Sequence, residues 1–474
     1  MSYDYDVIVI GAGAVGENVA DYATRGGLKV ALVENELVGG ECSYWACMPS
    51  KALLRPGAAL HAALSVEGAK QAIPSQAKLD VPAVLARRDA ATSQWDDSGQ
   101  VKWTKSAGID LVRGTAEITD IRKVTIDSRT YTARYAVVAA TGSSAFVPDV
   151  PGLRDAKPWT SREATSAKSI PESLIVVGGG VVACEMATAY AGLGSKVSMV
   201  VRGQTLLGGQ EDFAGQLVAE ALEKLGVSIF LNTSLSKVER SGTSVTAALH
   251  GGQNIQASEI LVATGRTPNT ANLGVKQFQL PTLPGGWLDV DDSLLVRTTD
   301  WLYAVGDVNG RALLTHQGKY QARAAGSVIA ARALGKGLHT DAWGIHVATA
   351  DGSAVPQVTF TNPEVASVGL MSHIAAQKGI NAKAVDYNLA WLAGSSVYSD
   401  DYKGQARLVV DIDRDVVVGA TFVGPETGEL LHAATIAIVG SIPIERLWHA
   451  VPSYPTVSEI WLRLLDKYLS EKQG

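Results

Sequence analysis

The chain begins with a short apolar run that leads directly into closely spaced glycines. The run Asp6–Ile10 predicts a strand, and the glycines are followed by a segment that predicts a helix through Tyr22. A second apolar run, Lys29–Val33, predicts the next strand and ends on Glu34. This order of strand, glycine turn, helix and strand is typical of a βαβ unit.

The glycine turn fits the fingerprint of a dinucleotide-binding fold. Gly11, Gly13 and Gly16 have the spacing at which backbone N–H groups reach a pyrophosphate at a helix N-terminus. Glu34, 23 residues past Gly11, is placed to accept both hydroxyls of an adenosine ribose.

The same pattern recurs later in the chain. The apolar run Leu174–Val177 leads into a second glycine turn, and the run Lys196–Val201 ends on Arg202. The fingerprint positions of this second turn are Gly178, Gly180 and Ala183. Each copy also has a later strand that closes on Ala-Thr-Gly, which adds Thr141 and Gly142 to the first site and Gly265 to the second. Two complete copies predict an α/β protein with two Rossmann-like nucleotide-binding domains.

The two copies differ at the residue that would meet the ribose. Glu34 suits free hydroxyls, as in FAD, whereas Arg202 suits a 2′-phosphate, so the second site favours NADPH. No further Arg or Lys follows within Gly203–Gly208, which keeps NADH as an alternative reductant. A solvent-exposed cation at the end of a strand is the other interpretation of Arg202.

Cys42 and Cys47 are two of only three cysteines in the chain, and four residues separate them. A chain so poor in cysteine does not use them as structural staples, so the pair suggests thiols that are oxidised and reduced in turnover. No second Cys or His cluster completes a metal-ligand set, and no metal site is predicted.

Pro49 suits the first turn of a helix running through Leu54. On one regular helix, residues five apart point about 140° apart, so a bridge there would bend the backbone.

Composition limits the partners and the location. The 474 residues predict about three domains, and the net charge of −6 gives no basic footprint for nucleic acid or an anionic membrane. The acidic start, Met1–Asp6, and the short apolar run after it do not fit a signal peptide. We therefore expect a cytoplasmic protein with no membrane partner.

The cysteine segment, both fingerprints and the run Tyr303–Asp307 resemble the pyridine nucleotide–disulfide oxidoreductases. This flavoprotein family includes dihydrolipoamide dehydrogenase, glutathione reductase and mercuric reductase. The resemblance covers essentially the whole chain. It implies an FAD-binding domain, an NAD(P)-binding domain, a return to the FAD-binding domain and an α+β dimerisation domain, in residues 1–150, 151–280, 281–345 and 346–474. The last of these fits predicted strands at Gln357–Phe360, Ala406–Asp411 and Val416–Val423 and helices at Gly428–Val439 and Val457–Leu469.

The resemblance also implies roles for single residues. Cys47 would be the flavin-proximal thiol, and Cys42 the thiol that attacks the acceptor. Lys51 and Glu185 match the ion pair that the family places beside the flavin N5, and Asp307 matches the acid that contacts the ribityl chain.

One departure from the family limits the choice of substrate. Disulfide-reducing members carry a His-Pro-Thr-x-x-Glu segment, and here Tyr454 stands at the histidine position while Glu459 is kept. Phenols, with an ordinary pKa of about 10, are poor general bases at neutral pH. Mercuric reductase also has a tyrosine here, but the cysteine pair near its C-terminus has no counterpart in this sequence.

The leading hypothesis is a homodimeric FAD enzyme that passes electrons from NADPH through Cys42–Cys47 to a small-molecule acceptor, which is a disulfide, a metal ion or a quinone. A mercuric-reductase-like metal reductase is the first alternative. The second is the dihydrolipoamide dehydrogenase component of a 2-oxoacid dehydrogenase complex. A diaphorase activity that bypasses the cysteines is the third.

Overall fold

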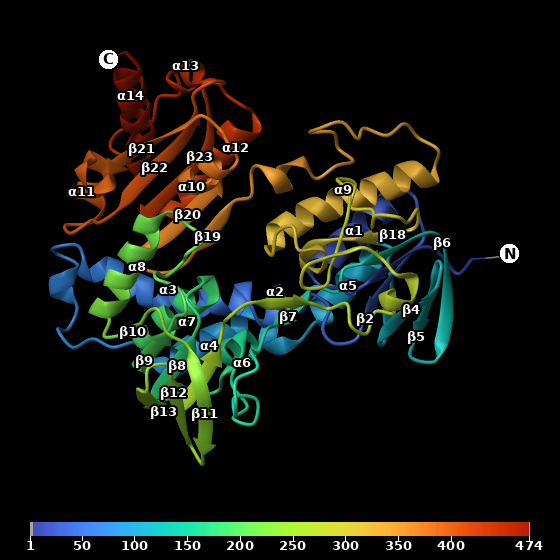
Figure 1. Cartoon of the computed structure of the whole chain (residues 1–474), viewed down its shortest axis with the longest axis horizontal. Coiled ribbons are helices and arrows are strands. Elements are labelled where there is room, and N and C mark those ends of the chain that lie inside the picture. Colours follow the sequence, from blue (N-terminus) through green and yellow to red (C-terminus); the bar gives the residue numbers. More distant parts are fainter. Residues whose placement is uncertain (1–2, 474) are drawn as a thin grey trace. The chain divides into compact units, whose positions relative to one another are not determined.

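The computed structural model describes residues 3–473 and divides into two compact units (Figure 1). The first unit runs to Pro49 and also contains Asp89–Phe146 and Gly265–Gly352. The second unit contains Ser50–Arg88, Val147–Thr264 and the chain from Ser353 onward. Each unit is described below on its own.

A sheet forms the core of the first unit (Figure 1). Its strand order is β3-β2-β1-β6-β5-β4, and β18 pairs with β6. Strands β1, β2, β3, β6 and β18 are parallel, whereas β4 and β5 join antiparallel. Their bounds are β1 Tyr5–Ile10, β2 Val30–Glu34, β3 Asp110–Arg113, β4 Ala116–Asp120, β5 Lys123–Ile126, β6 Arg129–Ala139 and β18 Leu302–Ala304. The continuous apolar runs in β1 and β2 are buried, as expected of strands covered on both faces.

Helices α1 (Ala14–Arg25) and α9 (Thr315–Ala333) pack along each other in this unit (Figure 1). Glycines of α9 allow the close approach. A Cβ at Gly318 would lie 2.6 Å from a side-chain carbon of Val15, and one at Gly326 would lie 2.6 Å from the Cβ of Tyr22. The contacts advance in the same direction along both helices, so the helices are parallel. Both therefore begin at the edge where the parallel strands end.

A second parallel sheet, with the order β10-β9-β8-β14, forms part of the second unit. It comprises β8 Ser173–Val177, β9 Lys196–Val200, β10 Ser228–Phe230 and β14 Glu259–Val262, with helices α7 Val181–Gly192 and α8 Asp212–Lys224. An antiparallel sheet follows, comprising β11 Leu235–Ser241, β12 Ser244–Leu249 and β13 Asn254–Ala257. The strand predicted to reach Val201 thus ends at Val200, one residue before the bend that carries Arg202.

The C-terminal part of the second unit is an antiparallel sheet with the order β19-β20-β23-β22-β21 (Figure 1). The strands are β19 Gln357–Thr359, β20 Glu364–Gly369, β21 Ala382–Asn388, β22 Gln405–Asp411 and β23 Val416–Gly424. Helix α12 (Leu431–Val439) packs on β20 and β23, and α14 (Ile460–Gln473) packs on β21 and β22. Each of these two helices is preceded by a short 3₁₀ turn where the sequence predicted α-helix.

The remaining elements are short. The helices are α4 Val81–Ala91, α5 Ser98–Ser106, α6 Ser161–Ser166, α10 Ser372–Gln377, α11 Ala393–Tyr398 and α13 Ile444–Leu447. The strands are β7 Ser143–Ala145, β15 Arg266–Pro268, β16 Thr282–Leu283 and β17 Trp287–Leu288.

Cys42 and Cys47 lie on separate helices rather than on one regular helix. Cys42 lies in α2 (Gly40–Tyr44), and α3 (Cys47–Leu64) begins at Cys47 and continues past the expected end at Leu54. Trp45 between them has φ −137° and ψ 1°, which is not helical. The chain turns at Trp45, so the divergence of side chains along a regular helix does not apply to this pair.

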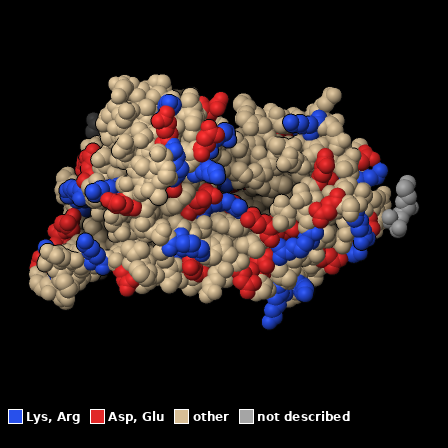
Figure 2. Space-filling model, turned by 90° about the horizontal axis from the view of Figure 1, so that it is seen from below, with Lys and Arg blue, Asp and Glu red and all other residues tan. Residues whose placement is uncertain are grey.

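The predicted α/β architecture, with two Rossmann-like sheets and an α+β C-terminal part, is confirmed. Within residues 3–473, no helix has both the length and the apolar character needed to cross a bilayer. On the face shown in Figure 2, Lys and Arg residues are interspersed with Asp and Glu residues. That mixed surface agrees with the net charge of −6.

Candidate active site

The first glycine turn has no room for side chains at Gly11 and Gly16. Gly11 has φ +101°, and a Cβ there would lie 2.4 Å from the carbonyl oxygen of Ala140. A Cβ at Gly16 would lie 1.8 Å from the carbonyl oxygen of Gly11. Gly13 is the N-cap of α1, and no side chain of the described residues caps that helix. The backbone N–H groups at the start of α1 are therefore suited to an anion such as a pyrophosphate.

Glu34 lies at the end of β2, where the ribose acceptor was predicted. One carboxylate oxygen accepts a hydrogen bond from the N–H of Ala12 at 2.8 Å, and the other accepts one from the N–H of Glu36 at 2.7 Å. These bonds fix the buried carboxylate beside the glycine turn. A carboxylate has about four acceptor sites, so further hydroxyl groups can bind it.

Asp307 follows strand β18 in the same unit. Its carboxylate accepts a 2.5 Å hydrogen bond from the hydroxyl of Ser143, and the Arg266 guanidinium lies 3.7 Å away. Burial raises the pKa of Asp307, while Ser143 and Arg266 oppose that rise. This buried carboxyl can accept hydrogen bonds from a polyol chain such as a ribityl group.

The two Ala-Thr-Gly segments lead into a pair of antiparallel strands. Strand β7 follows Gly142, strand β15 follows Gly265, and Ala145 pairs with Arg266. Gly142 has φ +69° and Gly265 has φ +146°, conformations that glycine adopts without strain. Thr141 donates a 2.9 Å hydrogen bond to the carbonyl of Asn269. Thr141, Gly142 and Gly265 thus lie close to Arg266 and Asp307 in the first unit.

Cys42 and Cys47 lie side by side, both half-buried. The pKa of the Cys42 thiol is raised, first by its hydrogen bond to Cys47 and then by burial. The Cys47 sulfur also lies 3.3 Å from the hydroxyl of Thr315, the first residue of α9. The Thr315 hydroxyl opposes the rise in the pKa of Cys42, so the two sulfurs and this hydroxyl form one hydrogen-bonded group.

Lys51 and Glu185 form an ion pair in the second unit. The Lys51 ammonium lies 2.8 Å from Glu185, whose side chain is 4% exposed. The other Glu185 oxygen accepts a 2.9 Å hydrogen bond from the N–H of Phe360. The same ammonium lies 4.8 Å from the centre of the Phe360 ring. Sequence reasoning paired the two charges but missed Phe360.

The second glycine turn repeats the geometry of the first. Gly178 has φ +130°, and a Cβ there would lie 2.3 Å from the carbonyl oxygen of Ala263. Gly180 is the N-cap of α7 and has open space where a Cβ would lie. Ala183, which replaces the third glycine, is fully buried. Arg202 follows β9 on the surface and forms no ion pair within residues 3–473.

Tyr454 and Glu459 differ sharply in exposure. Tyr454 is 76% exposed, whereas Glu459 is 5% exposed. One oxygen of Glu459 accepts hydrogen bonds from Arg463, one helical turn further along α14, at 3.0 and 2.5 Å. The other oxygen is buried and has no hydrogen-bond partner among the described residues. The acid that the family pairs with histidine is therefore held by an arginine, with one oxygen still available.

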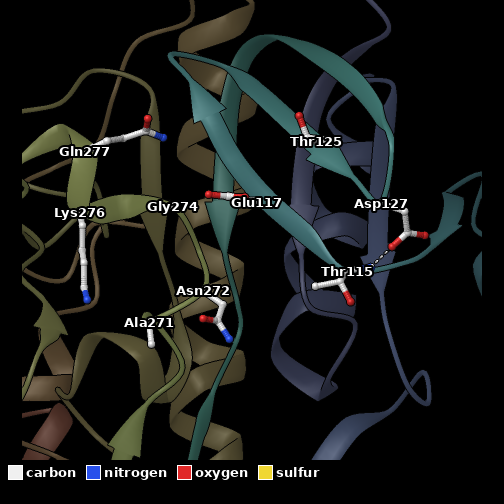
Figure 3. Close-up of a pocket in the computed structure, with 9 residues that line it drawn as sticks. All are labelled: Thr115, Glu117, Thr125, Asp127, Ala271, Asn272, Gly274, Lys276 and Gln277. Carbon is white, nitrogen blue, oxygen red and sulfur yellow. Dashed lines mark hydrogen bonds between the residues drawn. The ribbon is translucent and has the colours of Figure 1, made fainter.

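A cavity of about 690 Å³ lies elsewhere in the first unit, between the β4–β5 hairpin and the segment around Gly274 (Figure 3). Its side chains are of mixed charge, including Glu117, Asp127 and Lys276. None of the predicted site residues lines it. Within residues 3–473, no cluster of His, Cys, Asp and Glu has the arrangement of a metal site.

Comparison with known proteins identifies the family. The family model described as pyridine nucleotide-disulphide oxidoreductase matches residues 5–327, and the model of the dimerisation domain of that family matches residues 355–464. The chain belongs to this family. The family uses FAD and a pyridine nucleotide, as the two fingerprints predicted.

Two kinds of named relative have similar sequences. Mercuric reductase of Staphylococcus aureus is 30% identical over 465 residues, which is 96% of this chain and 81% of that protein. Dihydrolipoyl dehydrogenase of Haloferax volcanii is 30% identical over 482 residues, which is 98% of this chain and 96% of that protein. Because the sequence identity is 30% in both comparisons, it does not favour one of the two activities over the other.

A solved structure has the same fold. It is the HOCl-induced flavoprotein disulfide reductase RclA from Escherichia coli, with a TM-score of 0.82 and 22% sequence identity over 98% of this chain and 99% of that chain. At this identity the likeness establishes the fold.

Several residues of the site were not predicted from the sequence. Ser143 and Arg266 flank Asp307 but come from distant segments of the chain, so no local sequence pattern predicts them. Arg463 lies in the helix that was predicted at Val457–Leu469, whereas no helix was predicted at Thr315. Arg463 lies four residues after Glu459, the spacing of an ion pair on one helix face.

We expect Glu34→Ala to lower the free energy of unfolding of the flavin-free protein by about 1.5–3 kcal/mol, since two backbone N–H groups lose a charged acceptor. The ratio of flavin to protein after gel filtration should fall as well. Glu117→Ala, at an exposed position on β4 of the same sheet, is the control and should change neither quantity. Full flavin content and unchanged thermal unfolding in Glu34→Ala would contradict the role given to this carboxylate.

Proposed function

We propose that this protein is a homodimeric FAD enzyme that uses NADPH to reduce the Cys42–Cys47 pair, which then reduces a small-molecule acceptor. The matched dimerisation domain supports the homodimer. The scarcity of cysteine supports a reducing compartment, and we place the enzyme in the cytoplasm. The domain boundaries near residues 150, 280 and 345 are part of the same proposal.

The contact between the two thiols and Thr315 carries this proposal. FAD, when bound, supplies two-electron transfer between a nicotinamide and a disulfide. Opening the Cys42–Cys47 bond with two electrons and one proton leaves the proton on Cys42 and the negative charge on Cys47. The raised pKa of Cys42 favours that distribution, and the Thr315 hydroxyl, 3.3 Å from the Cys47 sulfur, can donate to a thiolate there. Thr315 also opposes the rise in the pKa of Cys42, so the hydrogen bond from Cys47 and burial are the effects that hold the proton on Cys42.

Residues outside the thiol segment support the remaining roles. Glu34, Asp307 and the turn at Gly11–Gly16 suit FAD, and the turn at Gly178–Ala183 suits the pyridine nucleotide. The assignment of the Lys51–Glu185 pair to the flavin N5 stays a prediction, supported by the burial of Glu185.

The acceptor is a disulfide, a metal ion or a quinone. A mercuric-reductase-like activity is the specific alternative, because soft thiolates bind Hg(II) without an acid–base histidine and Tyr454 replaces that histidine. A role as dihydrolipoamide dehydrogenase in a 2-oxoacid dehydrogenase complex is less favoured, since that role needs rapid thiol exchange. Recovery of an acyltransferase core with the tagged protein would revive it.

The test is a screen of NADPH oxidation with glutathione disulfide, lipoamide, Hg(II), Cu(II) and quinones. We expect Cys42→Ser to abolish turnover with the preferred acceptor, because Cys42 makes the bond to it. Ser43→Ala, the neighbouring position on α2, should retain turnover. Two-electron reduction should give a long-wavelength thiolate–flavin absorbance band that persists in Cys42→Ser and vanishes in Cys47→Ser.

Either of two results would overturn this assignment. Full activity of Cys42→Ser with the preferred acceptor would indicate a diaphorase that bypasses the thiols. Loss of the absorbance band in Cys42→Ser, with retention in Cys47→Ser, would exchange the roles of the two cysteines.

Arg202 should make the enzyme prefer NADPH. An arginine that binds the 2′-phosphate contributes about 1–3 kcal/mol, or roughly tenfold to a hundredfold in kcat/KM. We expect Arg202→Ala to lose that preference by raising the KM for NADPH while the kinetics with NADH stay unchanged. Lys196→Ala, an exposed cation at the opposite end of β9, is the matched control. Equal kcat/KM for the two nucleotides in the wild-type enzyme would make Arg202 a surface cation without a role in specificity.

Tyr454 should make ordinary disulfides poor substrates. General acid–base catalysis contributes about 10²–10⁴-fold, and we expect turnover of glutathione disulfide or lipoamide to be slower than flavin reduction by that order. Tyr454→His should raise disulfide turnover selectively, because the unpartnered oxygen of Glu459 is available to orient an imidazole. Tyr454→Phe is the control for ring size without a hydroxyl. Wild-type turnover of lipoamide at the rate of flavin reduction would show that the tyrosine is no handicap.

A further inference from the structure

Glu17 is a partly buried acid that none of the roles above uses. It lies in the first turn of α1, directly after Gly16, and one of its carboxylate oxygens is buried with no hydrogen-bond partner among residues 3–473. An ionised carboxylate with such an oxygen loses hydration that nothing replaces. The presence of an acid without a hydrogen-bond partner at this position therefore suggests a functional role for Glu17.

The packing of α1 against α9 brings Glu17 to the thiol side of the unit. Val15 of α1 packs against Gly318 of α9, so the first turns of the two helices lie side by side. Thr315 and Lys319 are four residues apart on α9 and hence on one face of that helix. Thr315 contacts the Cys47 sulfur, and the charge of Lys319 acts both on the Cys42 thiol and on Glu17. Lys319 therefore links the carboxyl and the thiol pair.

The groups around Glu17 set its protonation. Burial raises the pKa of Glu17 to about 7, the Lys319 ammonium opposes the rise, and the Glu34 carboxylate adds to it. Glu17 in turn helps to raise the pKa of Tyr44, which shares helix α2 with Cys42. Glu17 thus faces charged or titratable groups on α9, β2 and α2, and it changes charge in the neutral range.

We infer that Glu17 is a proton-holding residue for the Cys42–Cys47 couple: it takes up a proton when the disulfide is reduced and releases it on reoxidation. This inference rests on the proposed function. Reduction breaks the S–S bond with two electrons from NADPH delivered through FAD, and one proton goes to Cys42. The negative charge left on Cys47 disfavours a second anion nearby, so the Glu17 carboxylate takes a second proton from solvent. Reoxidation by the acceptor removes the two electrons and returns both protons.

The sign of the pH dependence follows from this scheme. Below about pH 7, Glu17 is protonated in both the oxidised and the reduced enzyme, so reduction takes up one proton. Above that pH, Glu17 is ionised in the oxidised enzyme and becomes protonated on reduction, so reduction takes up two protons. Glu17 acts through the thiols and does not bond to the acceptor, so it is a positioning residue.

The test is the reduction potential of the dithiol couple in the FAD-loaded enzyme, measured from pH 5.5 to 8.5. We expect the slope of the wild-type potential against pH to double above about pH 7, from one to two protons per two electrons. Glu17→Gln should keep the single-proton slope throughout, and Glu17→Asp should restore the break. Lys319→Met should move the break to higher pH, because the ammonium that opposes protonation is removed. Asp21→Asn, one turn further along α1 and paired with Arg25, should behave as wild type.

A second measurement reports on the thiol without the flavin. In the reduced protein at pH 8, Glu17 holds a proton, so alkylation of Cys42 should proceed at the same rate in the wild type and in Glu17→Gln. A rate roughly threefold or more faster in Glu17→Gln would show an ionised Glu17 in the reduced protein and contradict the inference. At pH 6, where Glu17 is neutral, the two rates should agree. Peptide mass spectrometry assigns the alkylated cysteine.

The outcomes separate this inference from the function on which it rests. A reduced wild-type enzyme without the thiolate–flavin absorbance band would overturn the proposed function. An enzyme that shows the band, but whose slope against pH is the same in Glu17→Gln as in the wild type, would overturn only the role of Glu17. Should Glu17→Gln fail to fold, a break that does not move in Lys319→Met would contradict the inference by itself.

Discussion

The close packing of α1 against α9 is the constraint on which the site in the first unit depends. Glycines of α9 let the two helices approach until Val15 and Tyr22 touch its backbone face. Because the helices are parallel, both begin where the parallel strands end, and their first turns lie together. That one contact brings the anion-binding end of α1 and Thr315, with the thiols beside it, to the same edge of the sheet. A larger side chain at Gly318 or Gly326 would separate them.

Burial of ionisable groups at this edge shapes the chemistry. Asp307, Glu17 and Cys42 all have raised pKa values in which burial takes part, so their neutral forms are favoured there. Glu185 of the second unit is more deeply buried, and it has a lysine and a backbone N–H as partners. Asp307 also has partners, Ser143 and Arg266, so among these acids Glu17 is the one with a buried oxygen that no described residue hydrogen-bonds.

The sequence predicted the parts of the site that local patterns encode. Gly11, Gly178, Glu34 and Arg202 follow from the spacing of strand, turn and helix, and the strands were found within one or two residues. Pro49 indicated a helix start close to Cys47, as found, but the short helix α2 that carries Cys42 and ends before Trp45 was not predicted. The partners of Asp307 and the groups around Glu17 were also missed, since they come from segments far apart in the chain and depend on helix packing.

The replacement of the family histidine raises the question of where the proton goes. Glu459 is held by Arg463, Tyr454 is exposed, and His449, which packs against Trp448, lies five residues before Tyr454, so no imidazole stands at the family position. The first unit offers an acid that can store a proton, because Glu17 combines partial burial, an unpartnered oxygen and electrostatic contact with the thiols through Lys319. A carboxyl that only stores a proton need not touch the acceptor. Such an enzyme would suit acceptors that take electrons without taking up protons, as metal ions do.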